Sequence, residues 1–223
     1  MLVNPVRLVK DRIKDRMGHP LEAYWEIEVR DTNGKLLTFR KFKAKSWLAQ
    51  FVFVLKGHFM MTIGVNANAG NTQVTDTSGV ARGYPYIGQS IYNSGLCLNA
   101  VSGDSSYGLV VGSSDTPNAI NTYAMGNIIP HGSGANQLLY GQTTIENPTN
   151  PTGTNYWMFR IIRTFTNNSG ASITVKEIGL IMASWDSSGA TRYFLIARDV
   201  ISPVTVPAGA TLTVRYIPKI TVS

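Results

Sequence analysis

The carboxyl-terminal third of the chain alternates strand-forming segments with turn-forming residues, and this pattern constrains the fold more than any other feature of the sequence. The strand-forming segments are rich in Ile, Val, Thr, Phe and Tyr and span residues 156–166, 172–182, 192–198 and 211–222. The gaps between them contain Asn, Ser, Gly and Pro, which favour turns. We therefore predict an all-β protein with an antiparallel β-sandwich or jelly-roll-like core and one or two short N-terminal helices. No internal repeat is evident, which argues against a solenoid or a propeller.

A strand pair is also predicted near the amino end. Residues 21–30 alternate apolar and polar side chains, which is typical of a half-buried strand. Asn33-Gly34 follows and suits a tight type I′ turn, in which both central residues have positive φ. Such a turn sets three cross-strand pairs, two of them between opposite charges: Trp25 with Phe42, Glu26 with Lys41, and Glu22 with Lys45. The complementary charges favour a hairpin here.

The first 18 residues have the features of a short amphipathic helix. Asn4 and Pro5 suit a helix start, and apolar residues then recur at three-to-four spacing up to Gly18. The other face carries five basic side chains: Arg7, Lys10, Arg12, Lys14 and Arg16. Two interpretations stay open, a solvated helix face or a contact with another subunit or with packaged DNA. We divide the chain into this basic arm, residues 1–18, and a single β-rich domain, residues 19–223.

The most apolar run of the sequence lies within residues 47–56. Ser46 can cap a short helix there, although so apolar a run also suits a buried strand. The run contains Gln50 and stops at Lys56, well short of the 18 or more residues that a membrane-spanning helix needs. We therefore expect no membrane span. The charged amino-terminal residues argue against a secretory signal peptide.

Charge is distributed unevenly along the chain. Lys and Arg number 20 and Asp and Glu 13, for a net charge of +7, but residues 61–159 hold only five charged side chains. This central part is rich in Gly, Asn, Ser, Thr and Pro, which predicts short strands joined by long polar loops over residues 64–154. Residues 64–83 have almost no bulky apolar side chains and are interpreted as mobile or as ordered only against another chain. Loops of this length usually carry a contact function.

The composition excludes several classes of protein. With 43% apolar and 10% aromatic residues, the chain can form a packed core, so it is not disordered throughout. Cys97 is the single cysteine, which rules out a disulfide within the chain. Its neighbours Leu96 and Leu98 indicate a small core residue.

The sequence contains no recognised catalytic, metal or nucleotide motif. His19, His58 and His131 are far apart and are interpreted as surface or hydrogen-bonded structural residues. No phosphate-binding loop and no nucleophile elbow are present. Asp104 and Asp115 are interpreted as turn residues whose side chains accept hydrogen bonds from nearby backbone amides. We therefore expect no enzymatic activity, no metal and no cofactor.

Three parts of the sequence, taken in order, are similar to those of a known group of proteins. The first is residues 25–53, with a strand, an Asn-Gly turn, a basic strand and an apolar helix. The second is Gly-Leu-Val-Val-Gly-Ser-Ser-Asp-Thr-Pro at residues 108–117, and the third comprises residues 175–181, 194–199 and 204–214. Together they resemble small structural proteins, associated with the tail, neck or capsid, of tailed bacteriophages and related viruses.

This resemblance implies a virion protein that is made in the host cytoplasm and that self-assembles into the capsid, neck or tail without catalysis. Its partners would be copies of itself and other virion proteins, with possible contact to packaged DNA through the basic arm. The alternative is a receptor- or carbohydrate-binding β-sandwich module. In that case loop residues Tyr84, Tyr86 and Trp185 are the candidate contacts, because aromatic rings beside polar groups suit sugars. Trp157 lies in a predicted strand and is expected in the core.

Overall fold

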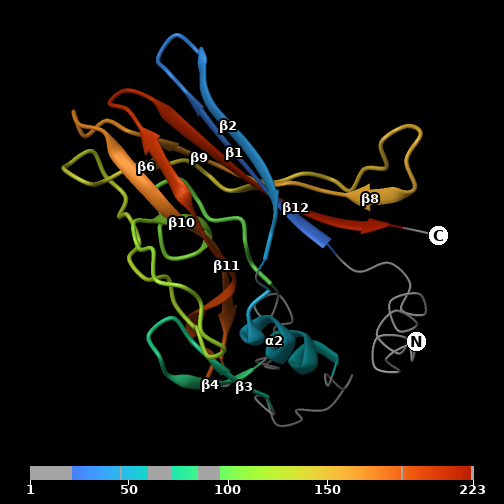
Figure 1. Cartoon of the computed structure of the whole chain (residues 1–223). Helices are drawn as coiled ribbons and strands as arrows, with labels where there is room; N and C mark the ends of the chain where they lie inside the picture. Colours follow the sequence, from blue (N-terminus) through green and yellow to red (C-terminus); the bar gives the residue numbers. More distant parts are fainter. Residues whose placement is uncertain (1–21, 46, 60–71, 85–95, 187, 222–223) are drawn as a thin grey trace, which may run out of the picture.

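The structure, a computed structural model, describes residues 22–45, 47–59, 72–84, 96–186 and 188–221 (Figure 1). Within these residues the strands pair in an antiparallel manner in three sheets, accompanied by one short helix. The predicted all-β class is therefore confirmed. The basic arm and its five cationic side chains lie outside the described residues.

The largest sheet has seven strands. Five of them lie in the order β2 (Leu36–Lys43), β1 (Glu22–Arg30), β12 (Thr211–Thr221), β9 (Ile161–Thr166) and β6 (Leu139–Tyr140). Two short strands complete it, since β7 (Thr144–Ile145) pairs with β9 and β8 (Tyr156–Met158) pairs with the end of β12. The strands from the two ends of the sequence, β1 and β12, are neighbours within this sheet.

A second sheet packs with the first around one hydrophobic core. Its order is β11 (Thr191–Val206), β10 (Ile173–Trp185) and β5 (Gly108–Gly112). Buried Trp25 and Phe165 of the large sheet belong to the same apolar cluster as Ile178 and Phe194 of the second sheet. The Trp25 indole N–H also donates to Asp199 Oδ2 on β11 at 2.7 Å. Two sheets that share a core in this way form a β-sandwich.

The β1–β2 hairpin confirms most of the predicted register but not the predicted turn. Trp25 lies opposite Phe42 and Glu26 opposite Lys41, as expected. Glu22 instead forms its ion pair with Lys43 at 2.5 Å, because β2 ends before Lys45. Figure 1 shows this hairpin at the edge of the large sheet.

The turn itself is a three-residue loop, not type I′. Gly34 has a positive φ of 79°, whereas Asn33 does not, and the Gly34 N–H donates to Asp31 O at 3.0 Å. The Asp31 carboxylate favours this form because its Oδ1 accepts the N–H groups of Asn33 and Lys35, each at 2.9 Å. A register shift between Val29 and Arg30 restores the expected pairing beyond the loop.

The apolar run after β2 forms a helix and not a buried strand. Helix α2 (Ala49–Phe59) begins two residues later than the predicted helix. Its entry is fixed by Leu48, whose N–H donates to Ile196 O at 3.1 Å, and by the stacked rings of Trp47 and Phe51, 4.1 Å apart. The proposed cap, Ser46, lies outside the described residues. No helix among the described residues is long and apolar enough to cross a membrane.

A small hairpin lies beside α2, where the sequence had indicated mobility. Strands β3 (Thr72–Thr75) and β4 (Ala81–Tyr84) form a two-stranded sheet next to the helix (Figure 1). Val74 is fully buried, and the Thr75 N–H donates to the Gln50 side chain at 3.0 Å. The prediction for residues 64–83 is therefore wrong over residues 72–83, because one core residue and a specific turn order the hairpin.

Cys97 also differs from its prediction as a core residue. It is exposed, with its Sγ 3.0 Å from Asn99 Oδ1. Cys97 forms an isolated antiparallel β-bridge with Ala183. The small apolar residue that is buried in this segment is Ala100, three residues later.

Candidate functional site

Arg163 is a fully buried arginine on β9 whose guanidinium binds backbone carbonyl groups. Its five N–H groups donate to the carbonyl oxygens of Gly141 (2.7 Å), Leu109 (2.9 Å), Tyr107 (3.0 Å), Val101 (3.1 Å) and Asp104 (2.5 Å). The guanidinium carbon also lies 4.8 Å from the centre of the Tyr140 ring. Burial lowers the pKa of Arg163 from its usual value. The Arg163 side chain thus connects the loop that precedes β5 to Gly141, the residue after β6, through hydrogen bonds.

Glu177 on β10 and Arg198 on β11 form a buried ion pair with an Nε to Oε2 distance of 2.7 Å. The Glu177 carboxylate also accepts three backbone N–H groups, from Asn127 (2.7 Å), Gly126 (3.0 Å) and Ser114 (3.3 Å). Arg198 in turn donates to Asn118 Oδ1 (2.6 Å) and to Thr116 O (2.9 Å). A Cβ at Gly112 would clash with the Glu177 carboxylate, which explains the glycine there.

These two buried centres explain how a charge-poor segment can be ordered. The loops over residues 101–127 have few charged side chains, so their backbone amides and carbonyls need partners from elsewhere. The partners are ionised groups on β9, β10 and β11, which form stronger hydrogen bonds than neutral groups do. The charged residues of the carboxyl-terminal strands therefore organise the neutral centre.

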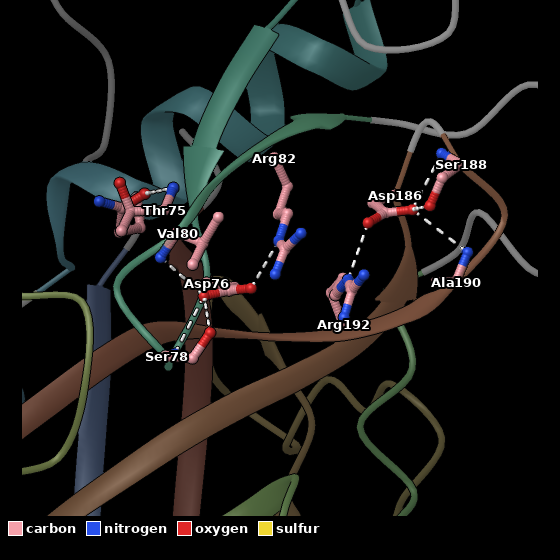
Figure 2. Close-up of polar contacts among 10 residues, drawn as sticks. Thr75, Asp76, Ser78, Val80, Arg82, Asp186, Ser188, Ala190 and Arg192 are labelled. Atoms are coloured by element: carbon pink, nitrogen blue, oxygen red, sulfur yellow. Dashed lines mark hydrogen bonds and ion pairs between the residues drawn. The ribbon is translucent and has the colours of Figure 1, made fainter.

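Two turns with the same sequence pattern, Asp-x-Ser-Gly-x-x-Arg, lie next to each other (Figure 2). In the first, Asp76 Oδ1 accepts the Ser78 N–H (3.0 Å), the Ser78 hydroxyl (2.6 Å) and the Val80 N–H (3.0 Å), and Oδ2 accepts the Arg82 Nε–H (2.7 Å). In the second, Asp186 makes the equivalent bonds to Ser188 (2.9 and 2.5 Å), Ala190 (3.2 Å) and Arg192 (2.7 Å). The turns close the β3–β4 and β10–β11 hairpins.

A backbone hydrogen bond joins the two turns directly. The N–H of Thr77, which follows Asp76, donates at 2.9 Å to the carbonyl of Tyr193, which follows Arg192. Burial raises the pKa of both aspartates, but the hydrogen bonds to each carboxylate outweigh it and lower the pKa to about 2. Both carboxylates therefore stay ionised in neutral and mildly acidic solution. The joined turns connect the small hairpin to the second sheet.

Sequence reasoning missed these features, although signals for them exist. The Asp-x-Ser-Gly-x-x-Arg pattern occurs at residues 76–82 and again at 186–192, as a short repeat within a chain that shows no long one. Arg163 lies two residues from both Ile161 and Phe165, so the period-two pattern places it on the inward face of its strand. An ionisable residue at an inward position is the signal for a buried charged centre.

A shallow cleft of about 520 Å³ lies beside the joined turns. Its walls come from Thr77, loop residues 105–106, 124–128 and 130, and the strands that carry Ile181 and Tyr193. The Tyr193 ring stacks on Tyr107 with an interplanar angle of 18° and a centroid distance of 6.1 Å. Tyr193 is thus held in place at the wall of the cleft.

An exposed apolar pair lies on the strand extension formed by β8 and the end of β12. Figure 1 shows these two strands projecting together from the rest of the sheet. Trp157 and Ile220 are direct cross-strand partners and are 52% and 51% exposed. Trp157 is therefore not the core residue that its strand position predicted, because the extension projects away from the part of the large sheet that packs against β10 and β11 (Figure 1). On the same extension the Lys219 ammonium lies 4.2 Å from the Tyr156 ring centre.

The other predicted site residues have different outcomes. Arg7, Lys10, Arg12, Lys14, Arg16 and Tyr86 lie outside the described residues. Tyr84 ends β4, and Trp185 is a half-buried residue at the end of β10, opposite Thr191. Trp185 is not among the residues that line the cleft.

Three of the polar residues interpreted from the sequence can be compared with their contacts. Asp104 Oδ1 accepts the Ser106 N–H at 2.7 Å, as predicted for a turn residue. His131 Nδ1 accepts the Tyr140 N–H at 3.1 Å, as predicted for a structural histidine. Asp115 forms an ion pair with Lys176 at 2.9 Å. Among the described residues, no group of three or more His, Cys, Asp or Glu side chains could hold a metal ion.

Comparisons of the chain with protein-family models, curated proteins and solved structures found no match.

Proposed function

We propose that the protein is a structural component of a virus particle that self-assembles in the capsid, neck or tail. The observation that carries this proposal is the exposed Trp157–Ile220 pair on the projecting β8–β12 extension. Two-stranded extensions are marginally stable in water unless another surface covers their apolar face. Trp is also enriched where subunits meet, because its large ring buries much apolar area.

A second exposed apolar surface lies at the opposite end of the same sheet. Leu36, Leu37 and Phe39 are 47%, 44% and 52% exposed on β2, which is the edge strand. The register places Arg30 opposite Thr211 at the hairpin end of β12, whereas β8 pairs near Lys219 at the other end. Two different apolar surfaces at opposite ends of a subunit suit head-to-tail contacts, which generate rings or extended arrays.

The charge-poor centre, residues 61–159, contains Trp157 and also supports an assembly role. Few exposed charges need to be desolvated when such a surface meets another chain, so contact costs little electrostatic free energy. Covering the exposed halves of Trp157 and Ile220 contributes about 1 kcal/mol for each side chain. This modest gain per copy accumulates when the contact is repeated through a symmetric particle. The three sequence segments that resemble phage structural proteins agree with this proposal.

The self-association of the purified full-length chain tests the assembly step. We expect oligomers that grow with concentration in sedimentation velocity experiments. The double variant Trp157→Ser, Ile220→Ser should weaken association at least tenfold, because its two contacts lose their apolar area. Ile120→Ser is the matched control, since Ile120 is 91% exposed but lies in a loop away from both strand ends.

Two results would contradict the proposal. If the chain stays monomeric at high concentration, self-assembly is rejected. If the double variant associates as well as the wild type, the Trp157–Ile220 surface is rejected as the contact. Mass spectrometry of purified particles tests the virion assignment separately, and absence of the chain from the particles would reject it.

A further inference from the structure

We propose that the cleft beside the joined Asp-x-Ser-Gly-x-x-Arg turns binds a neutral saccharide. This site is separate from the surfaces to which we assign self-assembly, and its argument does not depend on them. The cleft volume of about 520 Å³ is within the range of pockets that bind small ligands.

The lining of the cleft combines an aromatic wall with small uncharged polar groups. The lining residues include Tyr193, Met125 and Ile181, which have aromatic, thioether and aliphatic side chains, and Thr77, Ser105, Ser106 and Asn127, which have hydroxyl or amide side chains. A sugar ring presents the complementary chemistry, with an apolar C–H face and hydroxyl groups around its rim. The Tyr193 ring can stack on that face while hydroxyls and the amide exchange hydrogen bonds with the rim.

The absence of charge from the lining selects a neutral ligand. None of the side chains that line the cleft is ionised near neutral pH. The two nearest arginines in sequence, Arg82 and Arg192, each bind an aspartate at 2.7 Å, as Figure 2 shows. Each positive charge is therefore compensated locally. An anionic ligand such as a phosphate or a uronate would find no free cation among the lining residues to offset its desolvation.

Polar groups of the lining are available for a ligand because the backbone makes the structural bonds. The bonds of Thr77 and Ser106 to other described residues use their backbone N–H groups, which donate to Tyr193 O (2.9 Å) and Asp104 Oδ1 (2.7 Å). The Asn127 side chain uses its N–H group to reach Ser113 Oγ at 2.7 Å, and its carbonyl oxygen still has capacity. Hydroxyl and amide oxygens can thus face a ligand without loss of structural bonds.

The walls are held in place before any ligand arrives. Glu177 accepts the N–H groups of Gly126 and Asn127, Tyr107 stacks on Tyr193, and the turn-to-turn hydrogen bond fixes Thr77. A preorganised site loses little conformational entropy on binding, which matters for a weak ligand such as a sugar.

The probe is an array of immobilised oligosaccharides that includes neutral glycans together with sialylated and uronate-containing ones. We expect the full-length chain to bind one or more neutral glycans and to prefer them over the anionic ones. The affinity for the strongest neutral glycan, in soluble form, is then measured by saturation-transfer NMR for the wild type and for variants.

Two variants test the cleft by different routes. Tyr193→Ala removes the stacking wall, and Ser106→Arg fills the cleft from an exposed position that does not disturb the core. Each should weaken binding at least tenfold, whereas Tyr193→Phe should retain most of it. Asn168→Arg is the charge-matched control, because exposed Asn168 lies in the turn between β9 and β10, at the far end of β10. If Tyr193→Ala fails to fold, Ser106→Arg decides the result.

The inference is overturned if no neutral glycan binds, if only anionic glycans bind, or if Ser106→Arg binds as well as the wild type. If a neighbouring protein covers the cleft, no glycan binds and Ser106→Arg changes the self-association of the chain. That combination of results also overturns the saccharide inference. Failure of the assembly proposal is distinguishable, since Trp157→Ser, Ile220→Ser should alter association and leave glycan binding unchanged.

Discussion

Arg163 and Arg198 are both buried, yet their charges are stabilised in different ways. Arg198 has a carboxylate partner in Glu177, whereas the guanidinium of Arg163 donates to five backbone carbonyl oxygens. Each carbonyl carries only a partial negative charge, but together they satisfy every N–H group of the side chain. Arg163 therefore acts as a fixed binding partner for loop carbonyls that lie outside the regular strand ladders.

Replacing Arg163 should destabilise the protein strongly. In Arg163→Met, five carbonyl groups lose a donor, among them the buried carbonyl of Leu109, and we expect the free energy of unfolding to fall by about 3 kcal/mol or more. Arg163→Lys should recover only part of this loss, because an ammonium group has three donors in place of five. Urea unfolding followed by tryptophan fluorescence measures the change.

Arg160→Met is the control for this experiment. Arg160 forms a partly exposed ion pair with Glu146 at 3.1 Å, so its loss should cost less than about 1 kcal/mol. Equal effects of the Arg160 and Arg163 substitutions would show that the carbonyl contacts contribute no special stability.

At the scale of elements, the two Asp-x-Ser-Gly-x-x-Arg turns show how a local motif acquires a tertiary role. Each carboxylate organises its own hairpin turn through hydrogen bonds within seven residues of sequence. The bond between Thr77 and Tyr193 then connects hairpins that are far apart in the chain. The β3–β4 hairpin thereby gains support from the second sheet, which a two-stranded element needs for stability.

The turns should contribute an acid-dependent part of the stability. Asp76 and Asp186 have pKa values of about 2 in the folded chain, below the value of about 3.9 in an unfolded one. Their contribution is therefore complete above about pH 5, decreases as the pH falls through about 4, and is lost as it falls through the folded pKa of about 2. The double variant Asp76→Asn, Asp186→Asn should be less stable at pH 7 by about 2 kcal/mol for each turn, with a weaker pH dependence below 4.

Thermal unfolding at a series of pH values measures this effect. Asp115→Asn is the control, because the Asp115 side chain is 74% exposed and its pair with Lys176 is screened by solvent. A double variant whose melting temperature falls as steeply between pH 4 and pH 2 as that of the wild type would refute the assignment to these turns.

At the scale of the whole molecule, the net charge of +7 is less important than where the charges lie. Those on the hairpin are compensated across strands, since Lys41 pairs with Glu26 and Lys43 with Glu22. Those on β9, β10 and β11 include the buried groups that bind the central loops. The basic arm at residues 1–18 holds five basic and two acidic side chains and so contributes +3 of the net charge.

We propose that the basic arm is the part of the chain that contacts packaged DNA. Removal of residues 2–18 should weaken retention of duplex DNA and reduce the dependence of retention on salt, because fewer counterions are released on binding. Lys41→Gln, Lys43→Gln should change retention little, since glutamates already neutralise both cations. Filter binding across a salt titration provides the measurement, and unchanged retention in the truncated chain would argue against a DNA contact.

Local sequence patterns predicted the elements but not all of their neighbours. The period-two pattern of residues 22–30 predicted a strand with Trp25 inward, and Trp25 is buried. The same reasoning placed Trp157 in the core, where it does not lie, because an alternating pattern shows which residues share a face and not what covers that face. The predictions of a buried Cys97 and of a mobile segment at residues 72–83 were wrong for a related reason. The polarity of adjacent residues in the sequence does not determine whether a side chain is buried.

The sequence by itself determined the all-β class, most of the strands and the register of the first hairpin, because these depend on alternation, turn formers and cross-strand charge over short distances. Only the tertiary structure decided that Arg163 and the Glu177–Arg198 pair hold the neutral loops, that the two aspartate turns adjoin, and that Trp157 is exposed. These features arise from contacts between residues up to about a hundred positions apart in the chain. The spacing of residues along a sequence does not encode such distances, so the candidate sites became visible only when the sheets were in place.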